Sequence, residues 1–393
     1  MLQTLLNRLE GIYPEMVEIR RELHMNPELS FQEVQTPKFI AGFLQDLGLE
    51  VKTGVGGRGV VAKLKGGQPG KTVAIRADFD ALPIQEETDL SFQSKVPGVM
   101  HACGHDAHTA IALGLAKVFA ENRDQLKGNI VFIHQHAEEV LPGGAIAMIE
   151  DGCLDGVDVI FATHMENDYP VGTIAYRSGY IMSCADEFYI DVLGQGGHAQ
   201  SPHHTKDALV VGAQLVCNLQ HIVSRRVNPL KSAVVSVGSF HSGTATNIVN
   251  GEAKITGEVR AFEEEIRTDV EKMIEEITSA TCQAARSTYN YTYLRGYPST
   301  YNHPDITNLL VDSAKQVVDV HNIIEIEPMM GAEDFAYYTQ KIPGTYFFTG
   351  SANPEDETVY PYHHPKFKID ERAILVASKV LAAATIQYLN DEA

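Results

Sequence analysis

Basic residues are scarce in this sequence, and long apolar runs are absent. Its 393 residues include 31 lysines and arginines against 51 aspartates and glutamates, which gives a formal net charge of −20 at pH 7. This balance argues against binding to nucleic acid, which needs clustered basic side chains, and against binding to anionic membrane surfaces. An anionic ligand would therefore have to be held by local cations.

The sequence also lacks the marks of a membrane or secreted protein. No stretch of about 18 apolar residues predicts a transmembrane helix, and the N-terminus lacks the basic and then apolar regions of a signal peptide. Residues 2–13 instead have the spacing of an amphipathic helix. The cysteines are few, scattered and odd in number, which favours a reducing, cytoplasmic location. They are Cys103, Cys153, Cys184, Cys217 and Cys282.

The length predicts two domains, and the sequence contains two kinds of pattern. Up to about residue 182, apolar runs alternate with helical patterns, which is typical of an α/β domain with a mostly parallel sheet. The runs cover residues 59–64, 72–75, 129–133 and 158–162. After Pro298 the same pattern resumes, with a helix over 306–320, a buried strand over 344–350 and an apolar helix over 371–389.

Residues 188–294 have a different order of elements. Alternating apolar residues predict strands over 188–192, 233–240, 253–262 and 289–294, with helices over 207–223 and 264–286. The order β-α-β-β-α-β is that of a ferredoxin-like unit, which is complete in itself and suits an insertion. We therefore predict an α/β catalytic domain formed by residues 1–183 and 298–393, in which helices flank a mostly parallel sheet. Residues 184–297 would form an inserted lid domain.

One segment of eight residues is dense in metal-ligand types. His101-Ala-Cys-Gly-His-Asp-Ala-His108 holds three histidines, a cysteine and an aspartate just before an apolar-periodic helix. A thiolate and an imidazole two residues apart, at Cys103 and His105, can face one metal, and these ligands suit zinc or neighbouring transition ions. Cys103 alone would be explained as a buried thiol, but the density of the segment favours a metal site.

Further candidates follow the predicted strands of the α/β domain. His134-Gln-His-Ala-Glu-Glu139 follows one strand, Arg76-Ala-Asp-Phe-Asp80 follows another, His164 a third, and His363-His364 comes after the strand at 344–350. Ligands of open α/β sheets bind outside the carboxyl ends of the strands. One of the two adjacent glutamates could bind metal while its neighbour acts as a general base on water.

Together these motifs resemble those of the aminoacylase-like dinuclear metallopeptidase family. The closest branch is that of hippurate hydrolases, bacterial N-acyl-L-amino-acid amidohydrolases and plant auxin-conjugate hydrolases. The resemblance covers essentially the whole chain, and the motifs occur in the family's order. Besides the segments at 101–108, 137–139 and 363–365, they include Gly196-Gly-His-Ala199 and Gly331-Ala-Glu-Asp-Phe335.

The resemblance implies a site for two divalent metal ions, and a Cys/His/Glu set accepts zinc, manganese, cobalt or nickel. Glu138 matches the general base, and Asp80 matches the aspartate that orients a metal-binding histidine. Two residues earlier stands Asp78, where the carboxypeptidase members have a histidine. The cysteine replaces the family's usual bridging aspartate. The positions that match the metal ligands are Cys103, His105, Glu139, His164 and His363.

On the lid, the resemblance implies three further functional positions and a homodimer formed through this domain. His198 matches a residue that reaches the partner subunit's site and could donate a hydrogen bond to the developing oxyanion. Asn247 and Arg260 match positions associated with substrate binding. Arg260 could bind the substrate carboxylate through two hydrogen bonds, or it could be an ordinary surface arginine of a strand. We expect the remaining histidines of the motifs to support the ligands or the fold. These are His108, His134, His136 and His364.

The sequence thus predicts a metal-dependent amidohydrolase that cleaves N-acyl-L-amino acids into a carboxylic acid and a free amino acid. The alternatives are a dipeptidase or carboxypeptidase-type hydrolase, an N-acetyl-diaminopimelate deacetylase, and a metal-binding relative without catalysis, which the presence of Glu138 disfavours. Nucleotide binding through the glycine runs at 54–59 and 194–197 is disfavoured, because neither has the context of a phosphate loop. Two departures from the family pattern bear on metal and substrate preference. They are His136 in place of a proline, and Met165-Glu166-Asn167 after His164.

Overall fold

The computed structural model describes residues 1–356 and 358–391, which form two units. The first unit consists of Met1–Ile181, Thr300–Glu327 and the chain from Asp334 onward, and the second of Met182–Ser299 with Pro328–Glu333. The predicted limits had placed Pro328–Glu333 in the catalytic domain. The structure joins this segment to the second unit because the amide of Ser183 donates to the carbonyls of Met329 and Gly331.

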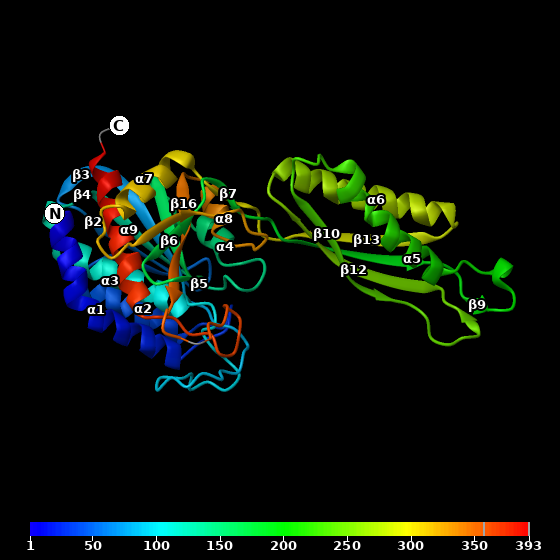
Figure 1. The fold of residues 1–393 in the computed structure, drawn as a ribbon, viewed down its shortest axis with the longest axis horizontal. Helices are drawn as coiled ribbons and strands as arrows, with labels where there is room; N and C mark the ends of the chain where they lie inside the picture. The colour runs from blue at the N-terminus through cyan, green and yellow to red at the C-terminus, as the bar shows by residue number, and fades with distance from the viewer. Residues whose placement is uncertain (357, 392–393) are drawn as a thin grey trace. The chain divides into compact units, whose positions relative to one another are not determined.

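The first unit is built on an eight-stranded sheet with the strand order β1-β2-β4-β3-β5-β16-β6-β15 (Figure 1). The central neighbours β4–β3, β3–β5 and β5–β16 are parallel, while β1–β2, β2–β4 and β16–β6 are antiparallel. The predicted α/β class with a mostly parallel sheet is confirmed. The strands are β1 (Glu50–Val55), β2 (Gly59–Lys65), β3 (Gln68–Asp78), β4 (Lys127–Gln135), β5 (Val159–Pro170), β6 (Thr173–Tyr176), β15 (Asn322–Glu325) and β16 (Gly344–Ala352). A separate pair joins β7 (Gly179–Met182) to β14 (Thr300–Asn302).

Three long helices, α1 (Leu2–Met25), α3 (His105–Glu121) and α9 (Arg372–Asn390), pack against one another and the sheet of the first unit. In α1, the residues that enter the core recur at helical spacing, from Leu5 and Leu9 to Met16 and Leu23. Among the described residues, α9 alone is long and apolar enough to cross a membrane by composition, but its side chains fill the core. The shorter helices are α2 (Gln35–Asp46), α4 (Ala145–Glu150), α7 (Pro304–Ala314) and α8 (Ala336–Thr339).

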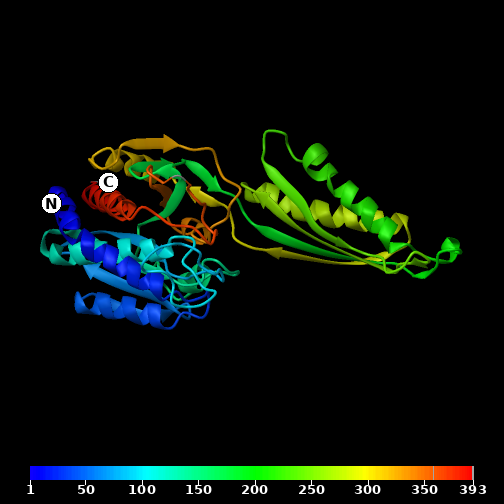
Figure 2. The same cartoon turned by 60° about the horizontal axis from the view of Figure 1, so that its bottom comes forward.

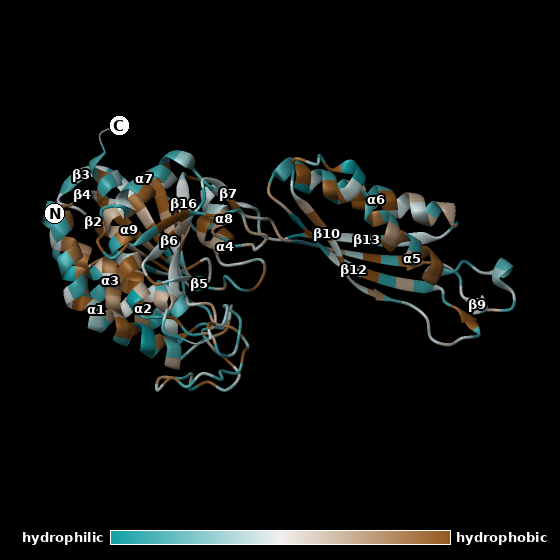
Figure 3. Ribbon diagram, in the orientation of Figure 1, coloured by the Kyte–Doolittle hydropathy of each residue, from teal (hydrophilic) through white to brown (hydrophobic). Residues whose placement is uncertain are grey.

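The second unit has the predicted order of elements around a four-stranded antiparallel sheet, β10-β12-β8-β13. Helices α5 and α6 both cover one face of this sheet (Figure 2). Figure 3 shows that α6 carries hydrophilic and hydrophobic residues in alternation along its length, as expected of a helix with one buried face. The elements are β8 (Asp186–Leu193), α5 (Ala208–Leu219), β10 (Ala233–His241), β12 (Glu252–Ala261), α6 (Glu264–Ala284) and β13 (Thr288–Arg295). A small pair, β9 (Gly197–His198) and β11 (Ile248–Val249), lies beyond the sheet.

A buried ion pair ties α6 to this sheet. Arg267 Nε and Nη2 lie 2.8 and 2.5 Å from the two carboxylate oxygens of Asp186. The same carboxylate accepts a hydrogen bond of 2.8 Å from the Tyr293 hydroxyl and one of 2.9 Å from the Gly296 amide. The buried charge is therefore fully paired, which a charge removed from water requires.

Candidate metal centre

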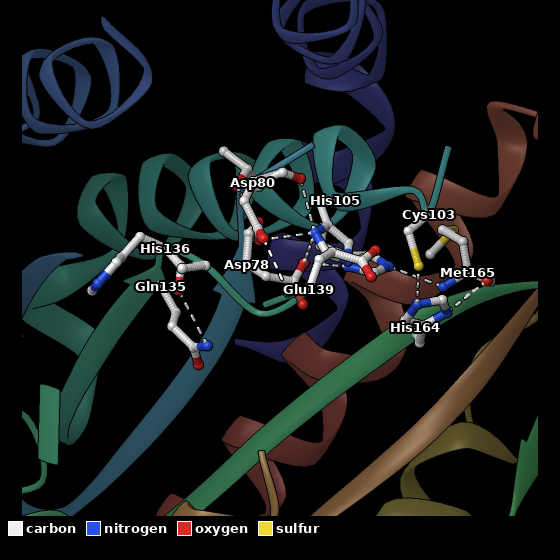
Figure 4. A network of polar contacts seen from close by, with 12 residues as sticks. Asp78, Asp80, Cys103, His105, Gln135, His136, Glu139, His164 and Met165 are labelled. Carbon is white, nitrogen blue, oxygen red and sulfur yellow. Dashed lines mark hydrogen bonds and ion pairs between the residues drawn. The ribbon is translucent and has the colours of Figure 1, made fainter. Parts of the chain in front are cut away.

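The strands of the first unit bring the predicted ligands to one edge of the sheet. Asp80 follows β3, Glu138 and Glu139 follow β4, and His164 lies within β5. Because these three strands are parallel neighbours, their carboxyl ends lie at the same edge. Cys103 precedes α3 and His105 is its first residue. Figure 4 shows Asp80, Cys103, His105, Glu139 and His164 gathered at this place.

Of five groups of ligand-type side chains found among the described residues, two consist of the predicted ligands and overlap at Cys103. In each, the atoms lie within 4.8 Å of one another: one group is Cys103, His105 and His164, and the other is Cys103, Glu139 and His363. The Cys103 sulfur is 3.2 Å from His164 Nε2, and His363 Nε2 is 3.2 Å from Glu139 Oε1. Since Cys103 belongs to both groups, its sulfur could contribute to holding either of two cations.

Two buried atoms in these groups show that the donor set fits metal ions. Among the described residues, the buried His105 Nε2 has no hydrogen-bond partner, and the buried Glu139 Oε1 has only ion-pair contacts, the shorter of 3.2 Å with His363 Nε2. An unsatisfied buried polar atom costs about 1–3 kcal/mol of stability. A divalent cation bound by these side chains would remove this cost. Burial, together with the charges of Glu139 and Glu138, raises the pKa of the Cys103 thiol well above its usual value. A bound cation would oppose these effects and favour the thiolate, which is the ligand form.

Asp80 fixes the orientation of His105. His105 Nδ1 lies 3.0 Å from the Asp80 carbonyl oxygen and 3.2 Å from its Oδ1. Burial alone would lower the pKa of His105, but the charges of Asp78 and Asp80 outweigh burial and raise it to about 10. With Nδ1 donating to Asp80, the other ring nitrogen faces the donor groups as a ligand. The second oxygen of Asp80 accepts from the Glu139 amide at 3.0 Å and from the Ser30 hydroxyl at 2.7 Å.

A second buried carboxylate, Glu33, holds the turn that carries both glutamates. Ala137, at the start of this turn, has a left-handed φ of 51°. Its amide donates to Glu33 Oε1 at 2.9 Å, and its carbonyl accepts from the Gly144 amide at 3.1 Å. Burial raises the pKa of Glu33 to about 7, and the charge of Asp80 adds to this effect. The sequence did not single out Glu33, since an isolated glutamate gives no local sign of a contact with a turn about 100 residues away.

His108, on α3, packs against the candidate ligand His164. Its Nδ1 is 2.6 Å from Asp78 Oδ1, and its Nε2 accepts a hydrogen bond of 3.0 Å from the Met165 amide. Its ring centroid is 4.8 Å from that of His164. Asp78 in turn contacts Arg76 at 2.5 Å. The other expected supporting histidines lie against aromatic rings or in the core: His136 against Phe31, His364 stacked on Tyr360, and His134 within β4.

The three predicted residues of the inserted domain lie in the second unit. His198 on β9 pairs with Ile248 on β11, next to Asn247, whose carbonyl accepts from the Ala199 amide at 3.0 Å. Arg260 lies elsewhere, on β12, where its guanidinium is 2.9 Å from Glu258 and 3.3 Å from the Met330 carbonyl. The structure thus brings His198 and Asn247 together and keeps Arg260 apart from them. Their roles stay predictions.

Comparison with known proteins decides the family. The model of "Peptidase family M20/M25/M40" matches residues 74–387, which is most of the chain. The chain belongs to this family. The family resemblance predicted from the motifs is therefore confirmed, and the protein is a hydrolase of the M20 type.

Relatives of this M20 protein are similar over most of their length. "Putative amidohydrolase YhaA" of Bacillus subtilis is 55% identical over 98% of both chains. The "N-acyl-L-amino acid amidohydrolase" of Geobacillus stearothermophilus is 46% identical over 76% of this chain and 80% of its own. The crystal structure of the Bacillus subtilis YXEP protein, described as a dinuclear metal-binding peptidase of the M20 family, is 35% identical, with a TM-score of 0.84, over 97% of this chain and 99% of that one. This relative and the two donor groups support two divalent cations in this M20 protein.

Proposed function

We propose that this M20 protein is a metal-dependent amidohydrolase that releases free amino acids from N-acyl-L-amino acids. The position of Glu138 carries the proposal. This glutamate is buried, and its carboxylate lies within 4.8 Å of ligand-type atoms of His105 and Glu139. A protein that only stored metal would not need a further carboxylate beside its ligands, whereas a hydrolase needs a general base there. The name of the Geobacillus stearothermophilus relative supports the substrate class.

We assign the cations to the two overlapping donor groups, with Cys103 shared between them. Zinc, manganese, cobalt or nickel would suit these ligands. When bound, the cations would lower the pKa of water and polarise the scissile carbonyl. The assigned ligands are Cys103, His105, Glu139, His164 and His363.

The residues around the cations would then move protons and orient groups. Glu138 takes a proton from the attacking water and later gives it to the departing amine. Asp80 keeps His105 in the tautomer that leaves Nε2 available. His198 donates a hydrogen bond to the developing oxyanion, and Asn247 and Arg260 bind the substrate. We further propose a cytoplasmic homodimer formed through the second unit, in which His198 acts on the partner's substrate. The cysteines, all free, suit a reducing compartment.

Amine release from a panel of substrates tests the function. The panel holds N-acetyl and N-benzoyl L-amino acids, N-acetyl-diaminopimelate and dipeptides, each with chelated enzyme and with enzyme refilled by one metal at a time. Release from an N-acyl amino acid that chelation abolishes and metal restores is the expected result. Release from dipeptides alone would favour the carboxypeptidase-type alternative, and no release with two metals bound would overturn the proposal.

A further inference from the structure

The candidate ligand His363 differs from the other four in how it is held. The side chain of His363 is 48% exposed, whereas Cys103, His105, Glu139 and His164 have side chains that are buried or nearly so. His363 also has a left-handed φ of 64°, which is unfavourable for a residue with a side chain. Packing therefore does not fix this imidazole. Its place must be set by the loop of residues 360–368 that carries it.

One side chain ties both ends of this loop to the strand that carries His164. Asn167 lies on β5, three residues after His164, and is only 4% exposed. Its amide nitrogen donates to the Tyr360 carbonyl and to the Lys368 carbonyl, each at 2.9 Å. Both N–H groups of the amide are thus used by the two stems of one loop.

Further contacts keep the amide of Asn167 in this orientation and connect the loop to the metal centre. The buried hydroxyl of Ser351 on β16 donates to Asn167 Oδ1 at 2.7 Å, so a flipped amide would lose this bond. Within the loop, the His363 amide donates to the carbonyl of Ala102 at 2.7 Å, next to Cys103. The stems are thus held by Asn167 and the tip by the segment that carries Cys103.

We propose that Asn167 is a positioning residue for His363. It holds His363 in the donor group formed with Cys103 and Glu139, and the cation assigned to this group is here called the second cation. Asn167 does not contact the cation. It fixes the distance between the loop and β5, and so keeps the exposed imidazole close to Glu139 and Cys103 before metal binds. This inference rests on the assignment of His363 as a ligand in the proposed function.

The chain offers a matched control for this proposal. Asn302 on β14 is fully buried and has the same pattern of bonds, with its amide nitrogen donating to the carbonyls of Arg177 at 2.9 Å and Tyr346 at 2.7 Å. Its oxygen accepts from the Tyr346 amide at 2.7 Å. Asn167→Asp and Asn302→Asp each remove two N–H donors that face carbonyls, but only the first affects the loop of His363.

The experiment compares these variants in two ways. In metal-free full-length protein, hydrogen exchange of the amides in loop 360–368 should be at least about tenfold faster in Asn167→Asp than in Asn302→Asp. In titrations with Zn²⁺ against a chromophoric chelator, the second equivalent should bind about 10–100-fold more weakly in Asn167→Asp, with the first little changed. Equal loop exchange in the two variants, or equal weakening of both zinc equivalents, would overturn the proposal.

A milder variant decides the question if Asn167→Asp does not fold. Ser351→Ala leaves both N–H donors of Asn167 in place but frees the amide to rotate, so the second zinc equivalent should weaken by about 2–10-fold. Unchanged zinc binding and loop exchange in that variant would also overturn the proposal. Neither readout depends on substrate. A silent substrate panel together with the expected exchange and zinc results would therefore reject the proposed function and keep the role of Asn167.

Discussion

Two regions of the molecule, the buried ion pair of the second unit and the candidate metal centre of the first, bury their polar groups in opposite ways. In the second unit, the buried pair of Arg267 and Asp186 has a partner for each carboxylate oxygen. At the strand ends of the first unit, several buried side-chain atoms have no hydrogen-bond partner within the described part of the chain. They include both ring nitrogens of His101 and of His134, and His105 Nε2.

This difference separates groups that stabilise a fold from groups that await a ligand. A buried charge that is completely paired adds specificity to its unit and leaves nothing for chemistry. Buried atoms without partners lower stability, and such a cost is typical of sites where a metal or substrate completes the arrangement. The following substitutions test this distinction. Changes at the candidate metal centre should affect metal binding or catalysis, or relieve the loss of stability there, whereas a change in the ion pair of the second unit should lower stability.

Glu138→Gln should have the largest effect, and only on catalysis. Removal of a general acid–base group slows hydrolysis by about 10²–10⁴-fold, because the amide neither accepts the proton of water nor returns one to the amine. Metal content and the midpoint of thermal unfolding should stay those of the unmodified protein. Steady-state rates and elemental analysis measure both. The control is Glu150→Gln at the exposed end of α4, which should keep full activity. Full activity of a metal-loaded Glu138→Gln protein would refute the role of Glu138.

Arg267→Met should have the reverse effect, on stability and not on metal binding. It leaves the Asp186 carboxylate buried without its cation, and removing one partner of a buried pair costs about 3–5 kcal/mol. Urea unfolding followed by hydrogen exchange of the second unit would measure this loss. Arg295→Met is the control, because Arg295 is 38% exposed where it bridges Glu264 and Glu271, and exposed pairs contribute about 0–1 kcal/mol. Equal losses in the two variants would contradict the comparison.

The same physical distinction explains what the sequence could predict. The long buried elements, such as β4, β16 and α9, follow from apolar periodicity, since most of their residues contact the core. The short strand β15 was missed because its residues are exposed or half-buried and carry no clear period. The helix predicted over 306–320 ends at Ala314, since the following residues turn toward β15.

The residues of the candidate site also fall into those that the sequence could predict and those that it could not. The positions of Glu138, Glu139 and His164 followed from the rule that ligands collect at the carboxyl ends of parallel strands. Glu33 and Asn167 could not be found so, because each acts through contacts with residues more than 100 positions away. A residue that supports a site through tertiary contacts has no local pattern, and only the fold reveals it.

Glu33→Gln tests whether a buried acid of the first unit costs stability as the pH rises. The pKa of Glu33 is about 7 in the folded chain against 4.5 in the unfolded chain. Above pH 4.5 the unfolded state therefore loses its proton while the folded state keeps it, so this group lowers stability as the pH rises from 4.5 to 7. Glutamine carries no such proton. The stability of the variant relative to the unmodified protein should increase by roughly 2–3 kcal/mol across this range, with no further change above it.

Urea unfolding of the metal-free protein at several pH values would measure the difference for Glu33. Glu18→Gln, at an exposed position of α1, is the control and should follow the pH dependence of the unmodified protein. Parallel stability curves for Glu33→Gln and the unmodified protein would show that the Glu33 carboxyl gains a compensating partner in solution.

Asp80→Asn should have a smaller effect, which falls on metal affinity. It tests whether a buried carboxylate of the first unit supports metal binding through His105. The asparagine oxygen would keep the hydrogen bonds from the Glu139 amide and the Ser30 hydroxyl, which places the NH₂ group opposite His105 Nδ1. His105 Nδ1 would then keep only the backbone carbonyl of residue 80 as an acceptor and would face an NH₂ donor, which weakens the preference for the tautomer that leaves Nε2 free for metal. Metal affinity should fall by about 10–100-fold with little change in unfolding free energy. Ser30→Ala removes one donor to the same carboxylate without changing the tautomer of His105. It should therefore bind Zn²⁺ more tightly than Asp80→Asn, and equal affinities in a chelator competition would mean that Asp80 supports the turn and not the protonation of the histidine.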